Sequence, residues 1–257
     1  MRGSFSQRYA LDLGIDGPGA LRGTFPNPAG GLNLALVVTA LLLGLIVDRY
    51  GGLTGQLAAS VWMWAVFFRL LGTSPRGWRL PFYACLIWSA AGEIFLSLVW
   101  GLYTYRLENI PFFVPPGHVL VLWLGLTAAS RAPRWFVAAV PAIAALYALA
   151  AWWCRFDTFS ILLTGMFLLC MFRHEGRVLY AVMFVLSLLM ELYGTWMGNW
   201  VWHREVPYFG LTSLNPPLAV GAFYCVLDVL VGMTARGLTG RPRAFAAQLA
   251  VSASGVR

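Results

Sequence analysis

The sequence predicts an all-α integral membrane protein with eight transmembrane helices, arranged as two parallel four-helix repeats. The prediction rests on an apolar composition, on eight apolar stretches of sufficient length and on one internal repeat. Of the 257 residues, 60% are hydrophobic and only 11% are charged, with a mean hydropathy of +0.71. Soluble domains carry about 25% charged residues. The composition therefore excludes an ordinary soluble domain.

The apolar stretches approach the roughly 20 residues that a helix needs to cross the hydrocarbon core. In chain order they are 32–48, 55–72, 80–104, 117–130, 134–153, 157–172, 177–200 and 216–234. Little sequence is left for a soluble domain. We expect one membrane domain at 32–234, an N-terminal segment at 1–31 and a tail at 235–257.

The basic residues predict the orientation of these spans. All 18 are arginine, and cytoplasmic loops of membrane proteins carry an excess of basic residues. The N-terminal segment, the even-numbered connections and the tail hold 14 of them, whereas the odd-numbered connections hold 4 (18 − 14), namely Arg49, Arg106, Arg155 and Arg204. Both termini are therefore expected in the cytoplasm, with the protein in the cell (inner) membrane. Arginines dispersed over short loops form no basic face, which argues against a nucleic-acid partner.

An internal repeat divides the membrane domain. The stretch "SAAGEIFLSLVWGLYTY", which begins at Ser89, aligns without a gap to "SLLMELYGTWMGNWVW" from Ser187. The aligned polar pairs are Ser89 with Ser187, Glu93 with Glu191, Ser97 with Thr195 and Arg106 with Arg204. The glutamates lie 98 residues apart (191 − 93), a spacing that covers four predicted spans. Four is even, so the halves 32–130 and 134–234 should point the same way.

Glu93 and Glu191 are the candidate catalytic residues. A charged group at mid-bilayer costs several kcal/mol, and such residues normally face a bundle interior or cavity and have a function. We expect the two carboxyl groups to meet across the pseudo-axis and to perform acid/base chemistry. The alternative is that both are neutral acids that only hydrogen-bond neighbouring helices. The expected supporting polar residues are Ser89, Ser97, Ser187, Thr195, Arg106, Arg204 and Asp228.

Aromatic residues gather near the outer ends of the glutamate-bearing spans. The residues expected to bind substrate are Trp100, Tyr103, Phe112, Trp196, Asn199, Trp200 and Tyr208. An interfacial aromatic belt is the simpler interpretation for Tyr105 and Trp202. Aromatic faces also stabilise cations, so an acid in an aromatic cavity suits protonation of an isoprenoid double bond. His118 and His203 lie at span ends, where polar residues are ordinary, and no metal site or cofactor is predicted.

The segments around the glutamates resemble a known family. A mid-span glutamate is followed by "WGLYTY" or "GNWVW" and then by a proline-rich loop, "IPFFVPPGH" or "VPYFGLTSLNPP". This arrangement is similar to the multispanning carotenoid hydratases of the bacterioruberin pathway and to the small membrane lycopene cyclases. The similarity covers roughly 92–119 and 191–227. It implies an enzyme that hydrates or cyclises a carotenoid-like substrate.

Three functions are therefore open. The leading hypothesis is a membrane enzyme that uses Glu93 and Glu191 on a long apolar substrate, which enters from the surrounding lipid. The first alternative is a proton-coupled transporter whose two halves rock about the pseudo-axis. The second is a non-catalytic assembly or anchoring subunit, in which neither glutamate lines a cavity.

Overall fold

The computed structural model describes residues 30–74, 76–133, 135–172 and 176–239. The predicted N-terminal segment (1–31) and tail (235–257) lie largely outside the described residues. The described part contains seven α-helices: α3 (Gly30–Thr73), α4 (Arg79–Glu93), α5 (Val114–Ala129), α6 (Phe136–Cys154), α7 (Phe159–Met171), α8 (Arg177–Met197) and α9 (Gly221–Thr239). A short 3₁₀ helix, η1 (Arg76–Trp78), precedes α4, and a π-helix, η2 (Ile94–Val99), continues it.

Five of these segments are long and apolar enough to cross a membrane: α3, α4 with η2, α6, α8 and α9. Helices α5 and α7, with 16 and 13 residues, are apolar but shorter. The chain is therefore a multi-pass membrane protein by the length and composition of its helices.

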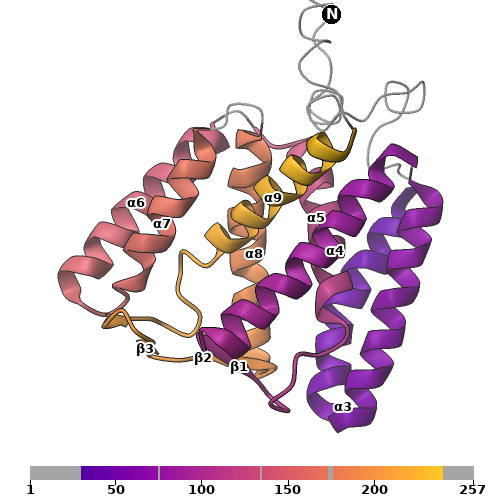
Figure 1. The fold of residues 1–257 in the computed structure, drawn as a ribbon, viewed down its shortest axis with the longest axis horizontal. Coiled ribbons are helices and arrows are strands. Elements are labelled where there is room, and N and C mark those ends of the chain that lie inside the picture. Colours follow the sequence, from indigo (N-terminus) through magenta and orange to yellow (C-terminus); the bar gives the residue numbers. More distant parts are fainter. Residues whose placement is uncertain (1–29, 75, 134, 173–175, 240–257) are drawn as a thin grey trace, which may run out of the picture.

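Helix α3 folds back on itself, which separates the first two predicted spans. Gly52 has φ 58° and ψ −145°, a backbone conformation that glycine adopts readily and that interrupts the helix. The ends of the two arms meet, because Asn33 Nδ2 donates to Thr73 Oγ1 at 3.0 Å and Arg69 Nε donates to Asn33 Oδ1 at 2.9 Å. The arms therefore run antiparallel to each other (Figure 1).

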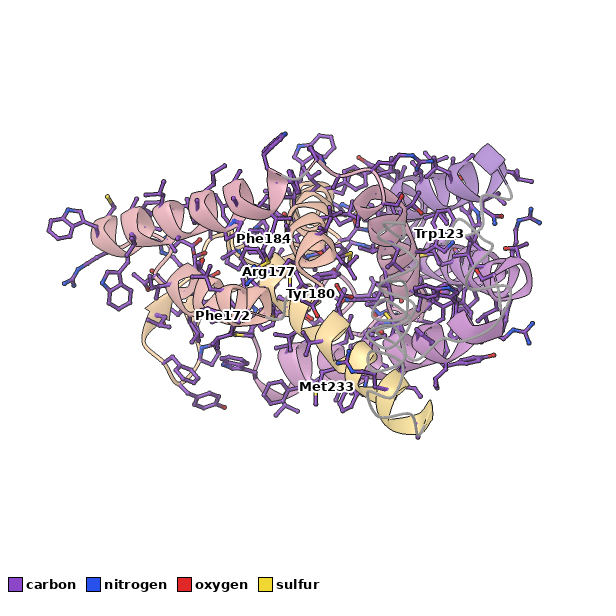
Figure 2. The ribbon with its side chains drawn as sticks, turned by 90° about the horizontal axis from the view of Figure 1, so that it is seen from above. Trp123, Phe172, Arg177, Tyr180, Phe184 and Met233 are labelled. Atoms are coloured by element: carbon purple, nitrogen blue, oxygen red, sulfur yellow. The ribbon has the colours of Figure 1, made fainter. Side chains whose placement is uncertain are left out.

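The helices form two groups that meet in the middle of the molecule. Helix α5 packs on α3 and α4, and α9 packs on α7 and α8, while α6 and α7 pack against each other. The groups join where α4 packs on α9 and α5 packs on α8. Seen from above, α3 and the α6–α7 pair lie at opposite ends of this arrangement (Figure 2). Phe184 of α8, labelled there, stacks on Phe167 of α7 with ring centroids 4.2 Å apart.

Two small antiparallel ribbons lie at the ends of α8 and of α4 with η2. Strand β1 (Tyr103–Tyr105) pairs with β2 (Trp200–Trp202), and β3 (Glu205–Val206) pairs with β4 (Leu211–Thr212). Because β1 follows η2 and β2 follows α8, both of these helical segments end on the same side of the molecule (Figure 1).

Several predicted span ends are wrong. The spans expected at 80–104 and 177–200 end at Val99 and Met197, because the chain turns into the strands at Gly101 and Gly198, each with φ 74°. Left-handed backbone of this kind ends helices and favours glycine. Helix α5 begins three residues earlier than expected, at Val114, with prolines in its first turn, where the missing N–H is no loss. Helix α9 begins at Gly221 rather than at 216.

Candidate functional site

Glu93, at the junction of α4 and η2, is buried and accepts two short hydrogen bonds. The phenols of Tyr103 and Tyr105 each donate to Glu93 Oε2 at 2.6 Å. Burial, and then the neighbouring Glu93 carboxylate, raise the pKa of both phenols well above the usual value, so both remain protonated donors. Two donors on one oxygen hold the carboxyl group in a fixed orientation.

Glu191, on α8, has a corresponding set of indole donors. Trp200 Nε1 and Trp202 Nε1 donate to Glu191 Oε2 at 2.8 and 3.1 Å. Gly194, one helical turn beyond Glu191, leaves the space for one of them, since a Cβ at Gly194 would overlap the ring of Trp200. Tyr224 of α9 reaches the other oxygen, with its hydroxyl 3.4 Å from Glu191 Oε1.

His118 of α5 lies between these two groups. Its ring stacks on Tyr224, with centroids 4.9 Å apart and an interplanar angle of 13°. Its Nε2 lies 3.5 Å from Glu93 Oε1, and its Nδ1 lies 3.0 Å from the carbonyl oxygen of Val114. His118 therefore contacts the environments of both glutamates.

Two cavities meet at these side chains. The first, of about 530 Å³, lies among α3, α5 and α8, and Leu41, Met63 and Val121 contribute to its apolar walls. The second, of about 430 Å³, lies between α4 and α9, and is walled in part by Leu96 and Phe223. The residues common to both linings are Glu93, Tyr103, His118, Glu191 and Tyr224. These five polar residues lie where the two mostly apolar cavities meet, and we call this place the waist.

The second cavity reaches the outer surface of the helices. Trp88 of α4 lines this cavity and is nevertheless 39% exposed. Its Nε1 donates to Thr234 Oγ1 of α9 at 2.9 Å, so the indole bridges the two helices that enclose the cavity. By contrast, Leu41 and Met63, which line the first cavity, are buried.

The strand register relates the donors of the two glutamates. Tyr103 pairs with Trp202, Thr104 with Val201 and Tyr105 with Trp200. Alternate residues of a strand point to one face, so one face of the ribbon carries both tyrosines and both tryptophans. A two-fold rotation axis between Thr104 and Val201 would superpose β1 on β2. Corresponding strand residues are then 97 positions apart in the sequence (201 − 104), whereas the two glutamates are 98 positions apart.

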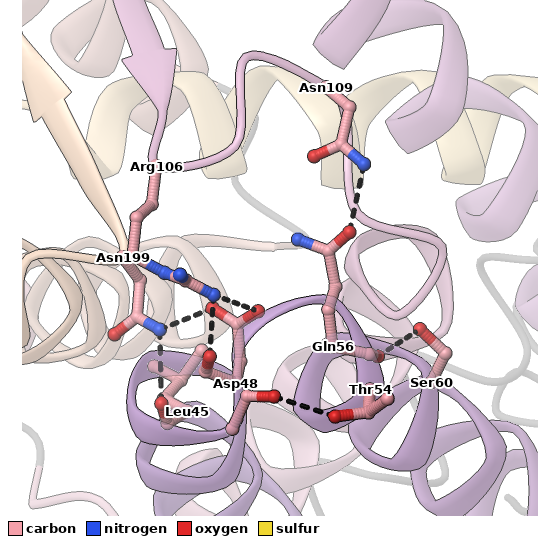
Figure 3. Close-up of polar contacts among 9 residues, drawn as sticks. Leu45, Asp48, Thr54, Gln56, Ser60, Arg106, Asn109 and Asn199 are labelled. Carbon is pink, nitrogen blue, oxygen red and sulfur yellow. Dashed lines mark hydrogen bonds and ion pairs between the residues drawn. The ribbon is translucent and has the colours of Figure 1, made fainter.

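The ribbon is fastened to α3 by a buried polar cluster (Figure 3). Asn199 Nδ2 donates to Asp48 Oδ2 at 2.6 Å and to the carbonyl oxygen of Leu45 at 3.0 Å. Arg106 donates to the carbonyl oxygen of Asp48 at 2.5 Å and to its Oδ1 at 3.3 Å. Asn109 donates separately to Gln56 Oε1 at 2.8 Å. The contacts of Asn199 and Arg106 hold the ribbon against the first arm of α3, and Asn109 reaches the second arm, which begins after Gly52.

Of the residues expected to bind substrate, Tyr103 and Trp200 line a cavity. The others lie elsewhere. Trp196, Phe112 and Tyr208 are 79%, 75% and 89% exposed on the outer surface. Asn199 belongs to the cluster with Asp48. Trp100 Nε1 donates to the carbonyl oxygen of Pro207, outside both cavity linings.

The supporting polar residues also lie in several different environments. Ser89 lines the second cavity. Ser187 and Thr195 donate to carbonyl oxygens of α8, and Ser97 donates to that of Tyr103. Arg204 is exposed. Asp228 is buried in α9, outside both cavity linings, and neither of its carboxyl oxygens has a hydrogen-bond partner among the described residues.

Sequence reasoning missed four residues of the site: Tyr105, His118, Trp202 and Tyr224. Tyr105 and Trp202 are 6% and 5% exposed, so an interfacial belt does not account for them. The spacing "YTY" and "WVW" was the available indication, because aromatic residues at every second position are typical of a strand with one buried face. His118 and Tyr224 come together only in three dimensions.

This arrangement can transfer protons within a largely apolar space. Two carboxyl groups, an imidazole and two phenols line both cavities, and indole and phenol rings supply faces that stabilise a cation. The described residues contain no group of three or more histidine, cysteine or acidic side chains placed to hold a metal ion. Comparison with protein-family models, curated proteins and solved structures finds no match to this chain.

Proposed function

We propose that the protein is an integral membrane enzyme that uses Glu93 and Glu191 for acid/base chemistry, of the hydration or cyclisation type, on a long isoprenoid or carotenoid-like substrate. The observation that carries the proposal is the position of both carboxyl groups at the waist, where the two mostly apolar cavities meet. A polar reacting centre with apolar space on either side suits a molecule that is apolar along its length.

The proposed reaction begins with one glutamate as a carboxylic acid and the other as a carboxylate. The acid gives its proton to one carbon of a double bond, and the neighbouring carbon becomes a tertiary cation. The rings of Trp200, Trp202 and Tyr103 lie close enough to the carboxyl groups to stabilise that charge. In a hydration, water adds to the cation and loses a proton to the carboxylate; in a cyclisation, an internal double bond attacks and a carbon loses the proton.

The experiment is a comparison of lipid extracts from cells that make an acyclic carotenoid and express wild type, Glu93→Gln, Glu191→Gln or Glu205→Gln. Glutamine keeps the shape of the side chain and removes the transferable proton. Glu205 is exposed on β3 and serves as the matched control. We expect product with wild type and with Glu205→Gln, and a loss of at least about a hundredfold with either cavity variant.

The extracts also distinguish the reaction types. A hydration adds the mass of water to the substrate, whereas a cyclisation changes chromatographic retention at constant mass. Extracts that are identical with and without the wild-type gene would contradict the enzyme proposal. Proton-coupled uptake that both glutamine variants abolish would instead support the transporter.

We further propose that the membrane domain has eight spans, as two parallel four-helix halves. The two arms of α3 supply the first two spans, and α5 and α7 are the short members of the set. The contact between the groups supports the proposal, because α4 with α9 and α8 with α5 are equivalent pairs under such a repeat.

The ribbon gives independent support for the repeat. Gly101 and Gly198, 97 residues apart (198 − 101), share φ 74°. Arg106 N donates to the carbonyl oxygen of Asn199, and His203 N donates to that of Leu102, both at 2.9 Å, which is one contact repeated by a two-fold rotation. The extra residue between Glu93 and the ribbon falls in the π-helix η2, a structure that accommodates a single-residue insertion in a helix. The repeat proposal therefore pairs Arg106 with His203, not with Arg204.

A further inference from the structure

The hydrogen-bond partners of His118 define which ring nitrogen carries a proton. Nδ1 lies 3.0 Å from the carbonyl oxygen of Val114, and a carbonyl oxygen can only accept. Nδ1 must therefore be the N–H of the ring. In the neutral ring, Nε2 is then left with a lone pair, and it faces Glu93 Oε1 at 3.5 Å.

The same reasoning identifies the free oxygen of Glu93. Its Oε2 already accepts from two phenols at 2.6 Å. Its Oε1 has His118 as its nearby polar group. A lone pair on Nε2 and a charged oxygen would repel each other across this contact, whereas one proton between them makes the contact attractive. Catalytic hydrogen bonds are often somewhat long without substrate and tighten when it binds.

We infer that Glu93 and His118 hold one transferable proton between Oε1 and Nε2, so that the Glu93 side of the site is the acid and His118 keeps its proton in place. This inference rests on the proposed function for its chemical use, but the proton itself can be detected without substrate. His118 acts through Glu93 and is a positioning residue. The stack on Tyr224 fixes the plane of its ring, which keeps Nε2 aimed at the carboxyl group.

The other titratable groups at the waist suit this assignment. Tyr103 and Tyr105 donate to the opposite oxygen of Glu93, and Tyr224 points its hydroxyl toward Glu191. None of these three donates to Nε2 of His118 in the hydrogen bonds described. Glu191 accepts from two indoles, which are donors only and cannot exchange a proton under ordinary conditions. Neither indole can supply a proton to Glu191, so the proposed proton donor lies on the Glu93 side of the site.

His203 provides a matched internal control. Its Nδ1 also lies 2.9 Å from a carbonyl oxygen, that of Gly101, but its Nε2 lies 2.9 Å from the hydroxyl of Thr104 instead of a carboxyl group. The two histidines thus have the same kind of partner at Nδ1, a carbonyl oxygen, and differ in the partner of Nε2, which is a carboxyl group only in His118.

The test is nitrogen NMR of the full chain, labelled with ¹⁵N-histidine and reconstituted in lipid nanodiscs without substrate. The loss of a resonance in His118→Gln or His203→Gln assigns each ring. In the wild type we expect a protonated Nδ1 in His118 and an Nε2 that is wholly or partly protonated. In Glu93→Gln the Nε2 of His118 should become a bare nitrogen, with Nδ1 still protonated, while both nitrogens of His203 remain unchanged.

An Nε2 of His118 with the same resonance in wild type and Glu93→Gln would overturn the inference, as would an unprotonated Nδ1. An activity measurement separates this result from the proposed function. His118→Gln should reduce product in lipid extracts by about a hundredfold, the scale of general acid catalysis, and His203→Gln should leave product unchanged. A shared proton in the spectra with no isoprenoid product in wild-type extracts would leave the inference standing and remove the proposed function.

Discussion

Replacing Asn199 with alanine should destabilise the protein by removing the anchor between the ribbon and α3. Asn199 is 2% exposed and Asp48 is 1% exposed, so water cannot readily replace the lost hydrogen bonds. The change removes one bond to a carboxylate at 2.6 Å and one to a carbonyl oxygen at 3.0 Å. Bonds to charged groups contribute about 1.5–3 kcal/mol and neutral ones about 0.5–1.5 kcal/mol, which gives about 2–4.5 kcal/mol in total.

Asn109→Ala is the matched control. Asn109 is exposed and makes one neutral bond, to Gln56 Oε1 at 2.8 Å, so its loss should cost about 0.5–1 kcal/mol. Both substitutions shorten the same side chain by the same atoms, and both residues belong to segments that contact α3 (Figure 3). The difference between them therefore isolates the buried bonds to Asp48 and Leu45.

The assay is thermal unfolding of the purified variants in one detergent, followed by tryptophan fluorescence. For a chain of this size each kcal/mol lowers the midpoint by about 2–4 °C. A loss near the middle of the range, about 3 kcal/mol, should lower the midpoint of Asn199→Ala by about 6–12 °C, against about 2 °C for Asn109→Ala. Equal midpoints for the two variants would refute the reasoning that the Asp48 cluster anchors the ribbon.

Three further outcomes are expected. Tyr105→Phe removes one 2.6 Å bond to the Glu93 carboxyl group and should lower product formation about 10- to 100-fold, the kinetic equivalent of about 1.5–3 kcal/mol; unchanged product in lipid extracts would count against a role for this phenol. Asp228→Leu removes a buried carboxyl group without a described partner and should raise stability by about 1–3 kcal/mol in the same unfolding assay; a loss of stability would show that the acid is satisfied. Reporter fusions should place Arg131 in the cytoplasm and Arg204 outside, and a common side for both would defeat the predicted orientation.

The helical part of the fold was predictable from the sequence because spans depend on local composition. Each predicted apolar stretch coincides with a helix or with one arm of α3, within a few residues at most ends. Two of the ends that moved are those before the ribbon, where "WGLYTY" and "GNWVW" remain as apolar as the helices that they follow. Hydropathy does not distinguish a helix from a strand there, whereas the backbone at Gly101 and Gly198 does.

The candidate site was only partly predictable. Glu93 and Glu191 stand out because an acid in an apolar stretch is rare. Their donors were harder to identify. Tyr103, Trp200 and Trp196 are all aromatic residues near a glutamate in the sequence, yet Trp196 lies on the outer surface. Burial is decided by packing between distant segments, and the sequence contains no local trace of the stack between His118 and Tyr224.

The π-helix η2 has a consequence for which changes of chain length the protein can accept. Tyr103 lies 10 residues after Glu93 and Trp200 lies 9 residues after Glu191 (103 − 93 and 200 − 191), yet both face their own carboxyl group, because η2 absorbs the extra residue. Deleting Leu98, an exposed residue of η2, would give both halves the same spacing, and η2 should become a regular helix while both tyrosines keep facing Glu93. A one-residue deletion in η2 should therefore be tolerated far better than one near the end of α8, which is already a regular helix, so that the inward and outward side chains of β2 would exchange places.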